Sequence, residues 1–177
     1  VPGDAFLWKA DAGEFLSVGP GIKATSKVTF DYSKYFQSNW HDGQPITMAD
    51  VIYSIYQSFD LAYNEDKTKI EFALGTTSKP LLDTFRGFRL IDDNTLEVYL
   101  DFWHFVPDYI ASYASPASLS MPWEVLAAMD ELVFVKRQAA FSDTTASRFQ
   151  VPWLSLVMDR DARLVRRTLT EFIDRGY

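Results

Sequence analysis

The residues with the clearest chemical potential lie in the stretch WHDGQPITMAD, residues 40–50, where His41 is followed directly by Asp42. His and Asp occur together in catalytic triads and in metal sites. Neighbouring residues on an extended backbone point to opposite faces, however, so these two side chains cannot easily share one site. The other histidine, His104, lies far along the chain in an aromatic run, and a zinc site would need carboxylates as its remaining ligands. We therefore predict no metal site, no cofactor and no catalytic role for His41.

The same stretch is fully explained as a turn followed by a capped helix. Asp42 and Gly43 favour a tight turn, because Gly readily adopts a positive φ. Pro45 holds the residue before it in an extended conformation. Thr47 and Asp50 resemble a capping box, with Asp in place of the usual Glu. The stretch is therefore predicted to connect a strand to a helix.

Acidic side chains are the second group that could do chemistry. A glycosidase needs two carboxyl groups facing one cleft, about 5 to 10 Å apart. The candidates are Asp92, Asp93, Glu124, Asp130, Glu131, Asp159 and Asp161. Hairpin turns and helix N-termini account for most of them without chemistry, and their spacing does not demonstrate a pair. A carboxylate-based hydrolase domain is therefore an alternative, and no catalytic residue is predicted.

Composition narrows the classes of protein further. The chain has 177 residues, 17 Lys and Arg against 24 Asp and Glu, and a net charge of −7, which would repel a phosphate backbone and argues against nucleic acid as a partner. Zero cysteines exclude a disulfide framework. No apolar run approaches the roughly 20 residues that span a bilayer. The aromatic content of 16% is more than a core of this size requires, so some aromatic side chains are expected to meet a ligand or partner.

Hydrophobic periodicity predicts the elements that position these residues. Residues 27–32 alternate in polarity like a half-buried strand, and a helix from about Met48 to Asp60 follows the capping residues. Its predicted apolar face consists of Val51, Ile52, Ile55, Tyr56 and Phe59. Residues 61–84 contain a Gly-Thr-Thr-Ser-Lys-Pro break and are predicted to form a loop with one short helix.

The clearest element is a hairpin over residues 88–100, in which alternating apolar residues flank Asp-Asp-Asn. One helix is predicted to have Pro122 as its first residue, and another, within residues 161–177, to end at Gly176. Residues 141–152 are predicted to form a loop. Together these patterns predict a single α+β domain with a small mixed or antiparallel sheet and packed helices, and with a helical extension over residues 136–177.

Two motifs carry a family resemblance. The first, W-x-D-G-x-P-x-T-x-x-D-V-x-Y-S at residues 40–54, is built on Trp40, Asp42, Gly43, Pro45, Thr47 and Asp50. The second is D-D-N-T-L-E-V-Y-L at residues 92–100, followed by an aromatic stretch and a return rich in Pro and Ser. This combination resembles the family 5 extracellular solute-binding proteins, the peptide, dipeptide and nickel receptors of ABC importers. The resemblance covers residues 27–135 well, and the remainder is similar to an insertion in longer members.

The resemblance implies that the chain is one piece of a larger receptor, similar to the smaller lobe of a type II periplasmic-binding-protein fold. Such receptors are extracytoplasmic, in the periplasm or at the cell surface. They close two lobes over a ligand and pass it to the permease of the importer. The expected function is therefore capture of a peptide or oligosaccharide by a monomeric binding module that is not an enzyme. A protein-docking module is a further alternative to the hydrolase.

Candidate ligand-binding residues are aromatic or polar side chains in loops outside the periodic segments, where recognition residues gather. They are Tyr63, Trp103, Tyr113 and Ser115. The resemblance places the return loop, residues 113–118, near the hinge and cleft. Trp40 is predicted to anchor its turn in the core, and Tyr53 and Tyr56 are predicted to pack within the helix pattern.

Overall fold

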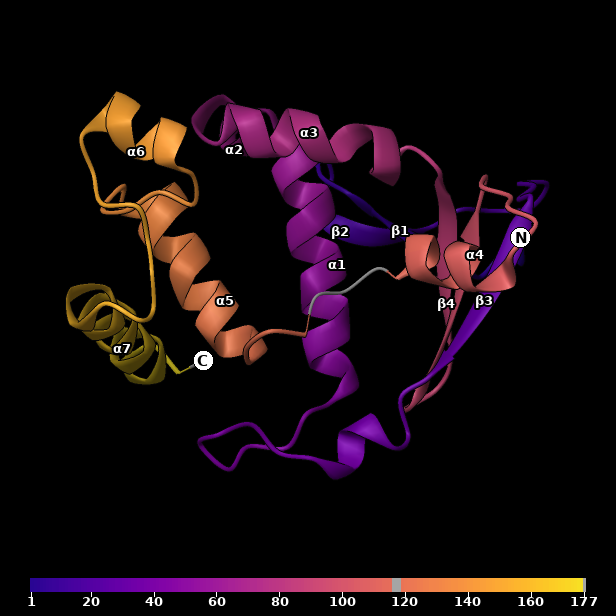
Figure 1. The fold of residues 1–177 in the computed structure, drawn as a ribbon, viewed down its shortest axis with the longest axis horizontal. Coiled ribbons are helices and arrows are strands. Elements are labelled where there is room, and N and C mark those ends of the chain that lie inside the picture. Colours follow the sequence, from indigo (N-terminus) through magenta and orange to yellow (C-terminus); the bar gives the residue numbers. More distant parts are fainter. Residues whose placement is uncertain (116–118, 177) are drawn as a thin grey trace.

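The predicted hairpin forms the centre of a five-stranded antiparallel sheet. In the computed structural model, which describes residues 1–115 and 119–176, β4 (Phe85–Asp92) pairs with β5 (Thr95–Leu100). β5 also pairs with the edge strand β3 (Ser26–Asp31), the strand predicted from residues 27–32. β1 (Phe6–Lys9) pairs with β4 and with the second edge strand, β2 (Glu14–Ser17). The strand order is β2-β1-β4-β5-β3. This antiparallel sheet and the helices packed around it (Figure 1) confirm the predicted α+β class.

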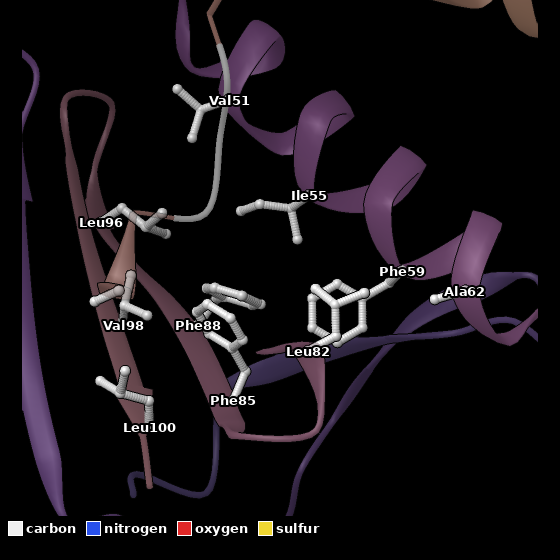
Figure 2. Close-up of a cluster of buried hydrophobic side chains, with 11 residues drawn as sticks. Val51, Ile55, Phe59, Ala62, Leu82, Phe85, Phe88, Leu96, Val98 and Leu100 are labelled. Carbon is white, nitrogen blue, oxygen red and sulfur yellow. The ribbon is translucent and has the colours of Figure 1, made fainter. Parts of the chain in front are cut away.

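Helix α1 (Met48–Tyr63) packs along the sheet and supplies four of the eleven buried residues of the core between them. Figure 2 shows Val51, Ile55 and Phe59 directed from α1 toward Phe88 and Val98 of the sheet. All five side chains are at most 5% exposed. Burying a side chain of this size contributes about 1.5 to 3 kcal/mol, so this contact stabilises the sheet half.

The predicted start of α1 is confirmed in detail. Thr47 Oγ1 accepts a hydrogen bond from the Ala49 N–H at 3.3 Å, and Asp50 Oδ2 accepts one from the Thr47 N–H at 2.8 Å. In the turn before it, Gly43 has a φ of 92° and its N–H donates to the Trp40 carbonyl at 2.9 Å. The end of α1 differs from the prediction, because the helix continues past Asp60 to Tyr63.

The prediction for residues 61–84, a loop with one short helix, is wrong. Two helices occupy it, α2 (Glu65–Ile70) and α3 (Phe72–Leu82), and Pro80 lies inside α3. The reason is tertiary packing: Gly75 allows α3 to approach α1 so closely that a Cβ there would lie 2.9 Å from the Leu61 carbonyl oxygen. The packing against α1 therefore outweighs the poor helix propensity of Gly and Pro.

Residues 141–152 also differ from the predicted loop, because α6 (Asp143–Phe149) lies within them. Ser142 is its N-cap, and its Oγ accepts a hydrogen bond from the Thr145 N–H at 3.2 Å. The prediction missed a capping signal that was present in the sequence.

The remaining helices complete the fold. The segment after β5 contains α4 (Pro107–Ala114), and the short 3₁₀ helix η1 (Tyr35–Gln37) precedes the turn before α1. α5 (Trp123–Asp130) runs into a π-helical turn, η2 (Glu131–Val135), and Pro122 is its N-cap, not its first residue as predicted. α7 (Asp159–Asp174) is followed by Gly176, with a φ of 85°.

A second apolar cluster joins α5, η2 and α7, with Leu132, Val133 and Val165 at its centre. In Figure 1 these helices lie on the opposite side of α1 from the sheet, so α1 is the central element between two cores. Among the helices of the described residues, none combines the length and apolar character needed to cross a membrane.

Candidate binding groove

A groove of about 820 Å³ lies between α1 and the second cluster. Its apolar wall comes from α5, η2 and α7 and includes Trp123, Phe134, Val135, Leu169, Phe172 and Ile173. Its polar lining includes Tyr53, Tyr56, Lys67, Asp130, Glu131 and Arg175. A mostly apolar concavity with a few polar groups is typical of a ligand site.

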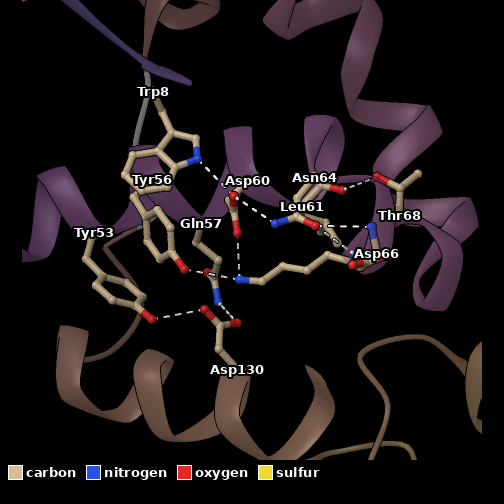
Figure 3. A network of polar contacts seen from close by, with 11 residues as sticks. Trp8, Tyr53, Tyr56, Gln57, Asp60, Leu61, Asn64, Asp66, Thr68 and Asp130 are labelled. Atoms are coloured by element: carbon tan, nitrogen blue, oxygen red, sulfur yellow. Dashed lines mark hydrogen bonds and ion pairs between the residues drawn. The ribbon is translucent and has the colours of Figure 1, made fainter. Parts of the chain in front are cut away.

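Asp130, on α5, is the centre of the polar lining, which we call the polar floor of the groove. Its side chain is 7% exposed, yet its Oδ2 accepts a hydrogen bond from the Tyr53 hydroxyl at 2.9 Å and its Oδ1 one from Gln57 Nε2 at 2.8 Å. Figure 3 shows these two bonds joining α5 to α1. Burial raises the pKa of Asp130 above its usual range, and burial followed by the charge of Asp130 raises the pKa of Tyr53.

A buried ion pair lies next to Asp130. Lys67 Nζ is 2.7 Å from Asp60 Oδ2 and donates to the Tyr56 hydroxyl at 3.1 Å, while Trp8 Nε1 donates to Asp60 Oδ1 at 2.9 Å. Burial alone would lower the pKa of Lys67, but the bonds to Asp60 and Tyr56 and the charge of Asp130 together raise it. Lys67 is therefore held as a cation at neutral pH.

The floor is positioned by a second face of α1. Tyr53, Tyr56, Gln57 and Asp60 recur at three- and four-residue spacing, which places them on one side of the helix. Tyr56 was predicted to pack, and its ring does pack against that of Trp8 on β1, at a centroid distance of 4.6 Å. The polar stripe was visible in the sequence and could have been recognised.

The turn motif lies at the mouth of the groove. Asp42 and Gln44 line its edge, and Asp42 Oδ1 accepts a hydrogen bond from the Gln44 N–H at 3.1 Å. Asp50 Oδ1 accepts a bond from the Trp123 N–H at 2.9 Å, which fixes the start of α5 against the start of α1. The capping residue thus holds the Trp123 ring at the groove, 5.9 Å from the ring of Tyr53.

The four residues predicted to bind ligand lie outside the set that lines this groove. Tyr63 ends α1, and its hydroxyl donates to Asp83 Oδ1 at 2.5 Å; burial raises its pKa. Tyr113, on α4, stacks on Phe102 at a centroid distance of 3.9 Å. Ser115 is exposed directly after α4. Of the return loop predicted near the cleft, residues 116–118 lie outside the described residues.

Trp103 belongs to a separate aromatic patch on the segment after β5. Its side chain is 67% exposed, and Phe105 and Tyr109 are exposed by 76% and 61%. The ring of His104 stacks on Phe105 at 4.4 Å and lies 4.7 Å from Tyr109. Trp103 is thus accessible, as a recognition residue must be.

The structure also places the remaining candidates of the turn motif, His41 and Trp40. His41 is exposed, and Trp40 is half-buried with an indole Nε1 that is shielded from solvent and has no hydrogen-bond partner among the described residues. Within residues 1–115 and 119–176, no group of three His, Asp or Glu side chains is arranged to hold a metal ion.

Comparison with known protein families and with curated proteins found no match. The two motifs and the geometry of the groove are therefore the observations that bear on function.

Proposed function

We propose that the chain is a ligand-binding lobe of an extracytoplasmic solute receptor, which captures a peptide or an oligosaccharide for an ABC importer. The observation that carries the proposal is the groove of about 820 Å³, in which an apolar wall faces a polar floor. One motif of the family resemblance supports it, because Asp42 and Gln44 of the turn motif line the groove.

The groove is preorganised for binding. Its floor is braced by the hydrogen bonds of Asp130 to Tyr53 and Gln57 and by the ion pair of Lys67 with Asp60. Side chains held in place before the ligand arrives reduce the entropy cost of association. The wall offers accessible apolar surface, since Val135 and Ile173 are 66% and 72% exposed.

A hydrolase is the second candidate, because two carboxylates, Asp130 and Glu131, line the same groove and burial raises the pKa of Asp130. A raised pKa suits a general acid. Against this role, both oxygens of Asp130 accept hydrogen bonds from α1, and Glu131 lies 3.4 Å from the Arg175 guanidinium. These contacts favour a structural role for Asp130. Turnover of nitrophenyl glycosides or peptides that is lost in Asp130→Asn would instead support the hydrolase.

The test is an NMR titration of residues 1–177 with pools of short peptides and of oligosaccharides, followed by calorimetry. We expect saturable shifts at amides around the groove, and weaker binding in Trp123→Ala. Trp153→Ala is the matched control, because Trp153 is also exposed, at 59%, but does not line the groove. Since one lobe supplies one wall of a cleft, a receptor with both lobes should bind more tightly.

Two results would count against this proposal. Saturable binding that depends on Trp103 and not on Trp123 would move the site to the aromatic patch. Absence of any shift with either pool, at millimolar ligand, would refute the assignment of the groove as a binding site.

A further inference from the structure

The lining of the groove has an excess of negative charge. Four carboxylates line it, from Asp42, Glu124, Asp130 and Glu131, against the cationic groups of Lys67 and Arg175. Both cations are already paired: Lys67 with Asp60 at 2.7 Å, and Arg175 with Glu131 at 3.4 Å and with Glu171 at 3.7 Å. Among the described residues that line the groove, carboxylates are open to a ligand but no cation is unpaired.

The carboxylates differ in what already contacts them. Asp130 is satisfied by Tyr53 and Gln57, and Glu131 by Arg175. Glu124, in the first turn of α5, forms no hydrogen bond or ion pair with any residue that the structure describes. It is half-buried and lines the groove together with Trp123, which is 37% exposed. Glu124 is thus the carboxylate most open to an incoming cation.

The groove already binds one cation of its own chain. Lys67 Nζ lies 5.2 Å from the ring centroid of Tyr56 and 4.9 Å from that of Phe134, and is paired with Asp60. Aromatic faces combined with a carboxylate are the usual environment for a bound ammonium or guanidinium group. Trp123 and Glu124 both line the groove, so an aromatic ring and a carboxylate are available there to a ligand as well.

We propose that the groove selects a ligand that carries a positively charged side chain next to an apolar one, namely a peptide with Lys or Arg beside an aromatic or aliphatic residue. The cation lies at Glu124 and the Trp123 ring, and the apolar side chain covers Val135 and Ile173. This inference rests on the proposed function and narrows its ligand from peptides and oligosaccharides to cationic peptides. Complementary charge gives selectivity more than raw affinity.

The test uses three tripeptides with blocked termini, Phe-Lys-Phe, Phe-Gln-Phe and Phe-Glu-Phe, so that the central side chain is the only difference in charge. Titrations are followed by NMR shifts of groove amides and by Trp fluorescence. We expect the Lys peptide to bind about five-fold more tightly than the Gln peptide, and the Glu peptide to bind most weakly. Higher salt should reduce the difference, since the contact lies at a partly exposed rim.

Two variants test whether Glu124 is responsible for the preference for the Lys peptide. Glu124→Gln should reduce the preference for the Lys peptide over the Gln peptide, because it removes the negative charge that only the Lys peptide can pair with. Glu65→Gln is the matched control, because Glu65 is a helical carboxylate with an 89% exposed side chain outside the groove. It should leave the preference intact.

Each outcome bears on a different claim. Equal binding of the three peptides, or tightest binding of the Glu peptide, would overturn the selectivity for cations while the groove remained a binding site. A preference that survives Glu124→Gln would overturn the assigned carboxylate. Failure of all three peptides and of the oligosaccharide pool would refute both the selectivity and the proposed function.

Discussion

Asp130 shows how one buried carboxylate can hold two helices together while its own charge is unfavourable. Its two oxygens accept bonds from Tyr53 and Gln57, so removing the side chain leaves two donors on α1 without an acceptor. An unsatisfied buried donor costs about 1 to 3 kcal/mol. Burial, however, penalises the charged form, so the bonds and the charge have opposite effects on stability.

These opposing effects predict that the stability of the protein depends on pH. Because the pKa of Asp130 is raised above its ordinary value of 3.8, folding favours the protonated carboxyl. The stabilising contribution of this group is therefore complete below the ordinary value and is lost as the pH rises through the raised folded pKa. Asp130→Asn is neutral at every pH and should match or exceed the wild type in stability at pH 7, whereas Asp130→Ala should lose about 1 to 3 kcal/mol.

Urea unfolding of the wild type and both variants at pH 4 and pH 7 measures these effects. The advantage of Asn over the wild type should be smaller at pH 4, where more of the wild-type carboxyl is protonated. If Asn and Ala destabilise the fold equally at pH 7, the charged carboxylate is stabilised by Lys67 and its pKa is not raised.

At the scale of single elements, the N-cap of α1 gives the simplest prediction. Thr47→Ala removes the acceptor of the Ala49 N–H and should cost about 1 kcal/mol. His41→Ala, in the same stretch, removes an exposed side chain and should leave stability unchanged. Urea melts of the two variants make the comparison. A loss in His41→Ala as large as that in Thr47→Ala would contradict the structural reading of this turn.

Helix α3 predicts an effect opposite to helix propensity. Ala is favoured over Gly inside a helix by about 1 kcal/mol, but a Cβ at Gly75 would lie 2.9 Å from the Leu61 carbonyl oxygen and 3.1 Å from Thr68 Cγ2. Gly75→Ala should therefore destabilise the protein, by about 1 to 3 kcal/mol. Thr77→Ala, on the exposed side of α3, is the control and should have little effect. Thermal melting of both variants and the wild type measures these effects. A higher melting temperature for Gly75→Ala than for the wild type would show that α3 does not pack this closely.

The elements that could be predicted from sequence are those whose signals are local. The capping box of α1 and the alternation around Asp92-Asp93-Asn94 lie within a few residues, and both were confirmed. α3 could not be predicted in this way, because its Gly75 and Pro80 oppose a helix and only the contact with α1 stabilises it. The polar stripe of α1 could be found, but a partner such as Asp130, far away in the sequence, needs the fold itself.

For the whole molecule, the main question is how two cores remain together. The sheet cluster and the cluster of α5, η2 and α7 share α1 as their boundary, and polar contacts connect them. Besides Asp130, Glu71 is a second connection: it is fully buried between α2 and α3, and its carboxylate accepts bonds from the Phe141 N–H and the Ser142 hydroxyl, both at 2.6 Å. Thr145 adds a bond to the Ile70 carbonyl at 3.0 Å.

These contacts predict that the second core can open separately. Glu71→Ala should release the start of α6 from α2 and α3, because the Phe141 N–H and Ser142 hydroxyl would lose their buried acceptor. Hydrogen exchange monitored by mass spectrometry should then be faster in α6 and α7, while β4 and β5 keep their protection, since stability varies among cooperative units of one fold. Glu65→Ala removes an exposed carboxylate from α2 and should change neither region. Equal acceleration across the sheet and the C-terminal helices in Glu71→Ala would show instead that the two cores unfold as one unit, and the groove between them would then be as rigid as the sheet.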